Sequence, residues 1–175
     1  MDSLFLDQMD FTELKEFLDF KAEQYENPIF LESDPIQLPH RFAKKEDIEI
    51  VGFLVSTIAW GNRKSIIKSG ERLLEIMEND PYNFISAYQS KEISDSSFVH
   101  RTFNVTDLDF FFRSLNNLYK NGGLENAFRS DPIISGIQGR IAQFRKVFLT
   151  IEHEQRVLKH LSDPMKNSAA KRINM

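Results

Sequence analysis

Apolar residues recur every three or four positions along most of this chain, a spacing that is typical of amphipathic helices. Asp10 and Glu13 match the pattern of a capping box, which predicts a first helix that ends before Asn27-Pro28. The apolar positions of this helix are Phe11, Leu14, Leu18, Ala22 and Tyr25. Prolines then interrupt the helical spacing of apolar residues between Asn27 and Ala43, so we expect an ordered or extended loop there.

The next stretch predicts the centre of the fold. Glu46 and Asp47 are typical of a helix start, and the segment from Ile48 to Ala59 is apolar on nearly every side. We therefore expect a buried central helix. Gly61-Asn62 ends this helix and begins the next one, because glycine suits a helix end and asparagine suits an N-cap. The third helix has its apolar positions between Ile66 and Met77.

Further helices are predicted along the rest of the chain. Asp80-Pro81 indicates the cap and first turn of a short helix through Ala87, and Thr106 with Asp109 resembles a second capping box. Extended character is confined to a brief segment from Phe98 to Phe103, so the predicted fold class is all-α. The predicted later helices cover Thr106 to Asn121, Ile134 to Ile151 after the Asp131-Pro132 break, and Glu154 to Leu161.

The composition is that of an ordinary globular domain. The 175 residues are 41% hydrophobic and 27% charged, which fits one helical domain over residues 1–175 with its sixteen phenylalanines mainly in the core. The lack of cysteine excludes disulfides, thiolate nucleophiles and cysteine-ligated metals. The longest apolar stretch, Val51 to Trp60, is too short to span a membrane. Acidic residues stand where a signal peptide carries positive charge, so we expect a cytoplasmic protein; they are Asp2, Asp7 and Asp10.

The charges are unevenly distributed along the sequence. The net charge is -4, but residues 136–175 carry eight basic and three acidic side chains, so the remaining residues sum to -9. A basic end on an acidic body indicates a face that binds a polyanion such as DNA. The alternative is that these charges lie on the solvated sides of amphipathic helices.

Two segments have the residues expected of a phosphate contact. Gly61 to Ser65 opens a predicted helix, whose free amides attract phosphate. Basic side chains add positive charge there, namely Arg63, Lys64 and Lys68. In the second segment His100-Arg101 stands between phenylalanines, and an arginine fork beside a histidine donor suits a nucleic-acid backbone. The structural alternatives are an ordinary helix cap and a histidine bonded to a backbone carbonyl.

A third segment offers a candidate nucleophile. Ser168 is a good N-cap, which predicts a new helix with Lys171 in its first turn. The positive end of a helix dipole favours the neutral amine that attack on a sugar C1′ requires. The alternative is an ordinary surface lysine. His153 and His160 are seven residues apart rather than the four of a zinc-binding helix, and we expect neither a metal nor a cofactor.

Four segments together resemble an uncharacterised bacterial protein family. Longer members of that family continue with an apolar helix and a Leu-Asp-Thr-His type segment. This order of lysine and aspartate is similar to that of helix-hairpin-helix DNA glycosylases, particularly the archaeal type for oxidised guanine. The resemblance implies an orthogonal multi-helix domain like the N-terminal part of that fold. The four segments are Asp34 to Ile36 with Pro39 to Phe42, Ile48 to Ile67, Phe98 to Leu108, and Ser168 to Met175.

The resemblance implies DNA binding and, in a full-length form, excision of a damaged base with Lys171 as the nucleophile. The sequence ends at Met175, before the aspartate-bearing half, and Ser162 to Asn167 lacks the usual Gly-x-Gly hairpin. We therefore expect an incomplete domain that is itself inactive. The alternatives are a non-catalytic helical module that binds a protein or small ligand in the groove around Trp60, and a structural domain without a ligand. The implied nucleic-acid contacts are Arg63, Lys64, Lys68, His100, Arg101 and Arg172.

Overall fold

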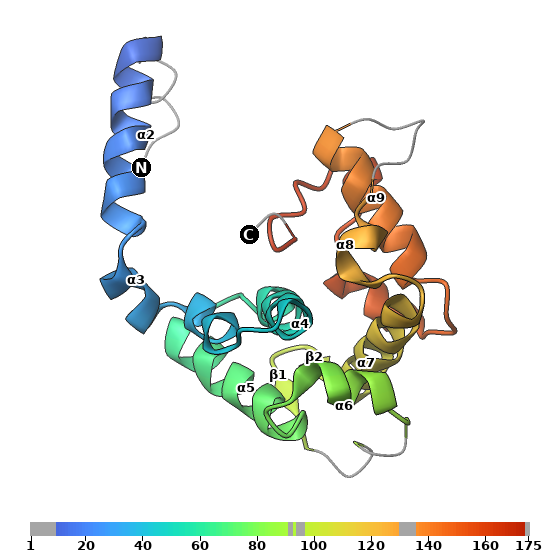
Figure 1. Cartoon of the computed structure of the whole chain (residues 1–175). Coiled ribbons are helices and arrows are strands. Elements are labelled where there is room, and N and C mark those ends of the chain that lie inside the picture. Colours follow the sequence, from blue (N-terminus) through green and yellow to red (C-terminus); the bar gives the residue numbers. More distant parts are fainter. Residues whose placement is uncertain (1–9, 91–92, 94–96, 130–135, 174–175) are drawn as a thin grey trace.

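The fold is all-α, as the apolar periodicity predicts (Figure 1). The computed structural model describes residues 10–90, 93, 97–129 and 136–173. Within those ranges the only strands are two of two residues each, which form one antiparallel hairpin. No helix of the described chain is long and apolar enough to cross a membrane. Several predictions lie outside the described residues, namely those on Asp2, Asp7, Asp131-Pro132, the start of a helix at Ile134, and Met175.

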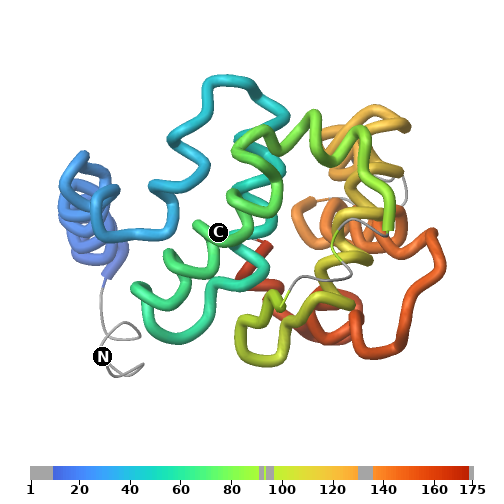
Figure 2. Tube along the Cα trace, turned by 90° about the horizontal axis from the view of Figure 1, so that it is seen from below, coloured from blue at the N-terminus to red at the C-terminus, as the bar shows by residue number. Residues whose placement is uncertain are grey.

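The first helix, α2 (Phe11–Tyr25), stands apart from the body of the molecule (Figures 1 and 2). The predicted capping box is confirmed, because Asp10 accepts a hydrogen bond from the Glu13 amide and Glu13 reaches back to the Asp10 amide. None of the side chains of α2 is buried. The helix is therefore held by its own backbone and cap rather than by packing against the core.

The predicted loop from Asn27 to Ala43 is wrong in part, because short helices occupy most of it. They are α3 (Pro28–Ser33), η1 (Pro35–Gln37) and η2 (Pro39–Arg41). Each one begins with a proline, whose fixed φ favours the first helical turn and whose missing amide is not needed there. The prolines that break a long helical period thus start three short helices.

The predicted central helix is confirmed as α4 (Lys45–Thr57), which buries apolar side chains on most of its faces. The helix after it, α5 (Arg63–Ile76), begins as predicted at Asn62, whose side chain accepts a hydrogen bond from the Lys64 amide at 2.9 Å. Gly61 joins the two helices with a φ of +102°, a conformation that favours glycine. This turn places the start of α5 beside the end of α4.

The short helix α6 (Pro81–Ala87) forms where it was predicted, but its side-chain cap comes from another helix. The Asp80 side chain makes no hydrogen bond to the backbone of α6 and instead accepts one from the Asn83 side chain. Asp47 of α4, which is buried, accepts a hydrogen bond from the Tyr82 amide at 2.8 Å. The cap is tertiary, so it also ties α6 to α4.

The segment expected to be extended forms the hairpin of β1 (Val99–His100) and β2 (Phe103–Asn104), with His100 opposite Phe103. Helix α7 (Val105–Lys120) follows directly. Its capping box consists of Asn104 and Asp107, so the prediction of Thr106 with Asp109 is wrong by two residues. Asn104 is the last residue of β2, so it already has the extended backbone that an N-cap needs.

The C-terminal part packs α8 (Gly123–Ala127) and α9 (Gly136–Phe148) against α7, followed by η3 (Gln155–His160) and η4 (Pro164–Lys166). The predicted extension of the long helix to Ile151 is wrong, because α9 ends at Phe148. The predicted short helix over Glu154 to Leu161 is present as η3.

The predicted helix after Ser168 does not form within the described residues. Ser168 Oγ accepts a hydrogen bond from the Ala170 amide, and residues 171–173 form a turn in which the Ile173 amide bonds to the Ala170 carbonyl. Ala170 has a φ of +45°, and this left-handed backbone prevents the serine cap from leading into a right-handed helix.

The core lies between α4, α7 and α9 and is rich in phenylalanine, as expected. Phe53 of α4 packs against Phe111 of α7 and Phe144 of α9, with ring centroids 5.7 and 5.3 Å apart. Such aromatic contacts stabilise by about 0.5–1.5 kcal/mol each beyond the burial of area. Phe11 and Phe20 of α2 are exceptions, because both are exposed.

Candidate nucleic-acid interface and apolar cleft

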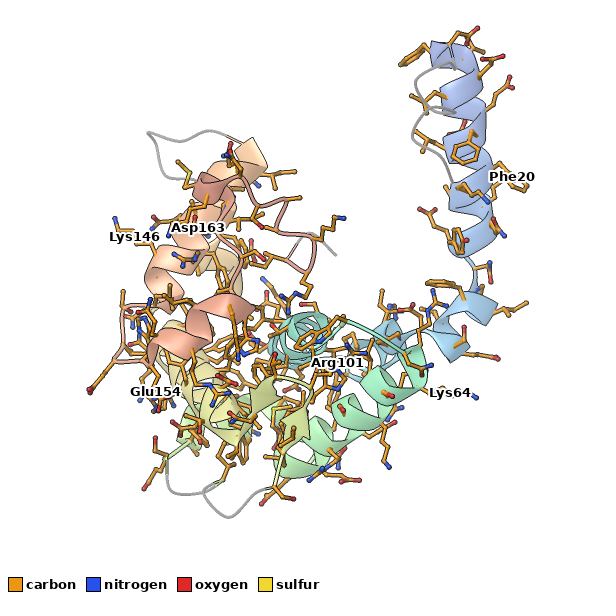
Figure 3. All side chains as sticks on the ribbon, turned by 180° about the vertical axis from the view of Figure 1, so that it is seen from behind. Phe20, Lys64, Arg101, Lys146, Glu154 and Asp163 are labelled. Atoms are coloured by element: carbon orange, nitrogen blue, oxygen red, sulfur yellow. The ribbon has the colours of Figure 1, made fainter. Side chains whose placement is uncertain are left out.

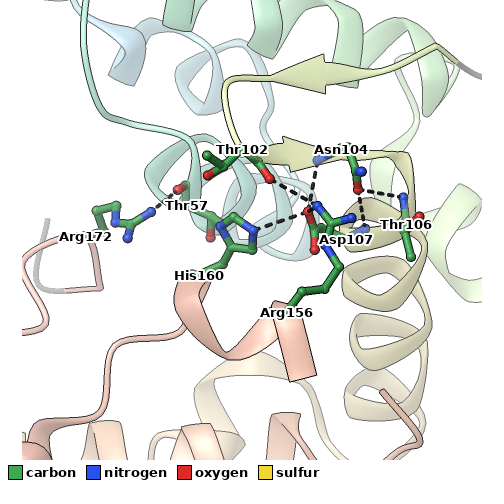
Figure 4. A network of polar contacts seen from close by, with 8 residues as sticks. All are labelled: Thr57, Thr102, Asn104, Thr106, Asp107, Arg156, His160 and Arg172. Carbon is green, nitrogen blue, oxygen red and sulfur yellow. Dashed lines mark hydrogen bonds and ion pairs between the residues drawn. The ribbon is translucent and has the colours of Figure 1, made fainter. Parts of the chain in front are cut away.

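The turn between α4 and α5 brings together predicted site residues from three separate segments. The guanidinium of Arg101, in the hairpin turn, lies against Gly61, so closely that a methyl group on Gly61 would be 2.5 Å from Arg101 Nη2. From the C-terminal segment, Arg172 Nη1 donates a hydrogen bond to the Thr57 carbonyl at 2.9 Å (Figure 4). The Arg172 guanidinium also lies 4.8 Å from the centre of the Trp60 ring. The turn between α4 and α5 therefore has an arginine from each of two distant segments beside it.

The basic side chains at the start of α5 differ in whether they form an ion pair. Lys64 and Lys68 are exposed, whereas Arg63 forms an ion pair with Asp34 at 3.7 Å and lies over the ring of Phe30. Among the described residues, no carboxylate lies within ion-pair distance of Lys64, Lys68, Arg101 or Arg172. We call the set of five cations the basic rim; it consists of Arg63, Lys64, Lys68, Arg101 and Arg172.

His100 belongs to the interior rather than to the basic rim. Its side chain is buried, and its Nδ1 atom lies 2.8 Å from Ser69 Oγ on α5. Burial is the main cause that lowers the pKa of His100, and the carbonyls of Trp60 and Ile58 act in the opposite direction. In this position His100 fastens the hairpin to α5 and so sets where Arg101 lies.

Lys171 lies in a different setting from the one that its sequence predicts. It is exposed and stands in the turn of residues 171–173, with no helix start beside it. The two features expected to favour a neutral amine, a helix dipole and burial, are therefore missing from the described structure. Its neighbour Arg172 is half-buried, and desolvation lowers the pKa of Arg172, although an arginine stays charged at any ordinary pH.

A buried polar cluster was not predicted and lies next to the turn (Figure 4). Asp107 at the start of α7 is fully buried, and its Oδ2 atom accepts hydrogen bonds from the Asn104 amide and from Arg156 Nη2, both at 3.0 Å. His160 Nε2 lies 3.3 Å from the same oxygen. Arg156 also donates to the Thr102 carbonyl. One carboxylate thus joins the hairpin, α7 and η3.

The environment of His160 disfavours its protonated form. Burial is the main cause that lowers the pKa of His160, followed by the positive charges of Lys159 and Arg172, while Asp107 opposes the shift. The imidazole stacks on Trp60, with ring centroids 6.2 Å apart. Asp107 is the N3 residue of the observed capping box, and the sequence gives no signal that Arg156 and His160 meet it, because this pairing is long-range.

An apolar cleft of about 890 Å³ opens on another side of α4. Apolar groups from η1, η2, α4, α8 and the C-terminal segment line most of it, including Ile36, Pro39, Gly52, Phe53, Phe128 and Ile173. Arg172 also lines it. Trp60 does not, because His160 stacks on its ring and Arg172 lies over it. Ala59 and Gly61 border this cleft, but Trp60 itself, around which a groove was expected, does not.

The fold and these surfaces define a class: an all-α multi-helix domain with a basic rim and an apolar cleft. In the described chain, no group of three or more histidine, aspartate or glutamate side chains is arranged to hold a metal ion. The chain belongs to a family described as protein of unknown function, DUF2400, which it matches over residues 34–175. This confirms the resemblance to an uncharacterised family, and the matched region includes every predicted site residue. No curated protein and no solved structure matches the sequence.

Proposed function

We propose that this chain binds nucleic acid, and that the basic rim contacts the phosphate backbone. The observation that carries the proposal is the position of Arg101 against Gly61, which puts a hairpin cation at the turn that leads into α5, the helix that carries Lys64 and Lys68. Figure 3 shows Lys64 and Arg101 on the part of the molecule formed by α4, α5 and the hairpin. Four of the five cations of the basic rim, all but Arg63, have no carboxylate partner among the described residues, and such a cluster suits a polyanion better than an intramolecular ion pair.

The N-terminus of α5 provides a second source of attraction for a phosphate group. Asn62 caps the amides of Lys64 and Ser65, but the positive end of the helix dipole still favours an anion nearby. Arginine can fork a phosphate, whereas lysine acts as a flexible point charge. The predicted contact is therefore to the backbone, with little preference for base sequence.

Fluorescence anisotropy with labelled single-stranded and duplex DNA, titrated over a range of salt concentrations, tests the proposal. Four or five phosphate contacts on duplex DNA give a slope of about -4 in a plot of log K against log salt. Absence of binding to either form at low salt would overturn the proposal, as would binding that does not depend on salt.

A charge-reversed pair assigns the binding to the basic rim. Lys64→Glu combined with Lys68→Glu should weaken binding about tenfold or more, because two phosphate contacts become repulsive. Lys146→Glu and Lys166→Glu together are the matched control, since both lysines are exposed and belong to α9 and η4 rather than to α5. Figure 3 shows Lys146 on α9, on the other arm of the molecule. Equal losses in the two double variants would show that net charge, rather than the basic rim, controls binding.

Base excision through Lys171 remains a prediction with less support than binding. It rested on a helix start at Ser168, and the described residues form a turn instead. We therefore propose binding alone for this chain.

A binding module for a protein or small ligand is the alternative function. Trp60 offers no open face for stacking, but the apolar cleft beside it is large enough for several side chains. The binding surface for this alternative function is therefore the apolar cleft rather than Trp60.

A further inference from the structure

Two apolar surfaces of this chain have no partner within the described residues. The first is on α2, where Phe11, Leu18 and Tyr25 recur every seven residues and so share one face of the helix. Their side chains are 82%, 55% and 49% exposed. Among the described residues, this face makes a ring contact through the edge of Tyr25 against Phe30 of α3. We call Phe11, Leu18 and Tyr25 the α2 stripe.

The second surface is the apolar cleft. Its carboxylates are already paired, because Asp34 forms an ion pair with Arg63, and Lys45 pairs with both Glu49 and Glu125. Arg172 is the exception among the charges that line it. Its guanidinium is half-buried and desolvated, and no carboxylate of the described chain lies within ion-pair distance of it. An occupant of the cleft should therefore be apolar and should carry a carboxylate.

We propose that the occupant is α2 of a second copy of this chain, and that the two copies exchange these helices in a symmetric dimer. Helix α2 has an apolar stripe and an excess of acid, with six carboxylates and two lysines between Asp10 and Glu26. The stripe fills the cleft of the partner, and a carboxylate beside it pairs with Arg172. The other four cations of the basic rim then remain for the phosphate backbone. Exchange of identical elements closes the assembly, so neither surface is left exposed.

The area available fits a stable dimer. Each side chain of the α2 stripe exposes roughly 100 Å², given the size of aromatic and leucine side chains. Two exchanged helices and the two cleft surfaces that cover them then bury roughly 1,200 Å² in total, which is at the lower limit for a specific interface. Figures 1 and 2 show α2 projecting from the body of the molecule, and the three side chains of the α2 stripe are exposed.

The oligomeric state of the full chain tests this inference without any nucleic acid. Size-exclusion chromatography with light scattering should give a dimer at micromolar chain concentration that dissociates on dilution. Leu18→Asp places a charge in the α2 stripe and should give a monomer. Phe20→Asp is the matched control, because Phe20 is exposed on the opposite side of the same helix and its variant should remain a dimer.

A substitution in the cleft tests the dimer without changing α2, so a loss of the dimer cannot then result from unfolding of that helix. Gly52 lines the cleft, and a Cβ atom there would have Pro39 Cβ as its nearest neighbour at 4.0 Å, so a side chain fits without moving α4. Gly52→Leu should occupy the cleft and give a monomer, whereas Gly52→Ala should leave the dimer intact. Mixing Leu18→Asp with Gly52→Leu should restore a weaker heterodimer, because one intact helix then meets one intact cleft.

Three results would overturn the inference. The first is a wild-type chain that stays monomeric at every concentration, which would favour another occupant of the cleft. The second is a dimer that both Leu18→Asp and Gly52→Leu leave intact. The third is a mixture of these two monomeric variants that forms no heterodimer.

Discussion

Asp107 Oδ2 and His160 Nε2 lie 3.3 Å apart in the interior, where α7 and η3 meet below the hairpin. Arg156 Nη2 donates to the same oxygen, so a single buried carboxylate holds two side chains from η3. This contact connects the C-terminal segment to the turn on which the basic rim is built.

Asp107→Ala should lower the free energy of unfolding by about 3 kcal/mol. The substitution removes the capping box of α7 and leaves Arg156 and His160 without their carboxylate, and breaking a buried pair costs about 3–5 kcal/mol. Asp107→Asn should cost less, because an amide oxygen still accepts hydrogen bonds. Urea unfolding followed by circular dichroism measures both losses. An Asp107→Ala chain within 1 kcal/mol of wild type, about the worth of the cap alone, would show that the cluster adds no stability.

Asn104→Ala and Thr106→Ala distinguish the observed N-cap of α7 from the one that the sequence suggests. Asn104 Oδ1 accepts hydrogen bonds from the amides of Thr106 and Asp107, so its loss should cost about 1 kcal/mol. Thr106 is exposed, and its replacement should change stability by less than about 0.5 kcal/mol. The same urea titration compares the two. A larger loss for Thr106→Ala would contradict the assigned cap.

Local patterns predicted the helical fold well because the information they use is local. The Asp10 capping box, the Asn62 cap and the apolar stretch of α4 all form as expected. The errors arise where a tertiary contact or a competing backbone preference decides the outcome. Asp47 caps α6 from another helix, and Ala170 turns the chain away from the helix that Ser168 would start.

The candidate site was predictable only in its residue types. Basic residues near Gly61, in the hairpin and near the C-terminus can be read from the sequence, but their convergence depends on the close approach of Arg101 to Gly61. The partners of Asp107 lie about 50 residues further along the chain, and no spacing rule links them. The burial of His100 was not evident either, because a buried and an exposed histidine have the same local pattern.

Stability should fall when the pH is lowered below the ordinary pKa of histidine. Burial lowers the pKa of His160 and His100 in the folded chain, so the unfolded chain binds protons more readily. Above about pH 6.5 both histidines are neutral in the folded and the unfolded chain, and the free energy of unfolding is highest. It falls as the pH drops toward the lowered pKa values of the folded chain. Urea unfolding at about pH 7.5 and about pH 5.5 measures the change.

The control for this pH effect is a histidine at the surface. His160→Gln should reduce the difference in unfolding free energy between the two pH values, whereas His40→Gln should not, because His40 is exposed. An unchanged difference in the His160→Gln chain would refute the role given to its titration.

Borohydride trapping on DNA that contains 8-oxoguanine should yield no covalent adduct with this chain. Lys171 is exposed in a turn, so it lacks the buried surroundings that an amine nucleophile uses. Gel electrophoresis under denaturing conditions detects an adduct. A trapped species that disappears in Lys171→Ala would contradict this expectation and would support base excision.

Two glycine substitutions should have opposite effects on stability. Gly61 has a φ of +102°, so Gly61→Ala should cost about 1–2 kcal/mol of backbone strain. The new methyl group would also displace the Arg101 guanidinium, and DNA binding should weaken with it. Gly52 lies inside α4 with room for a methyl group, so Gly52→Ala should stabilise by about 0.5–1 kcal/mol and leave DNA binding unchanged. Urea unfolding and anisotropy on both variants measure these effects, and tight DNA binding by Gly61→Ala would separate Arg101 from the interface.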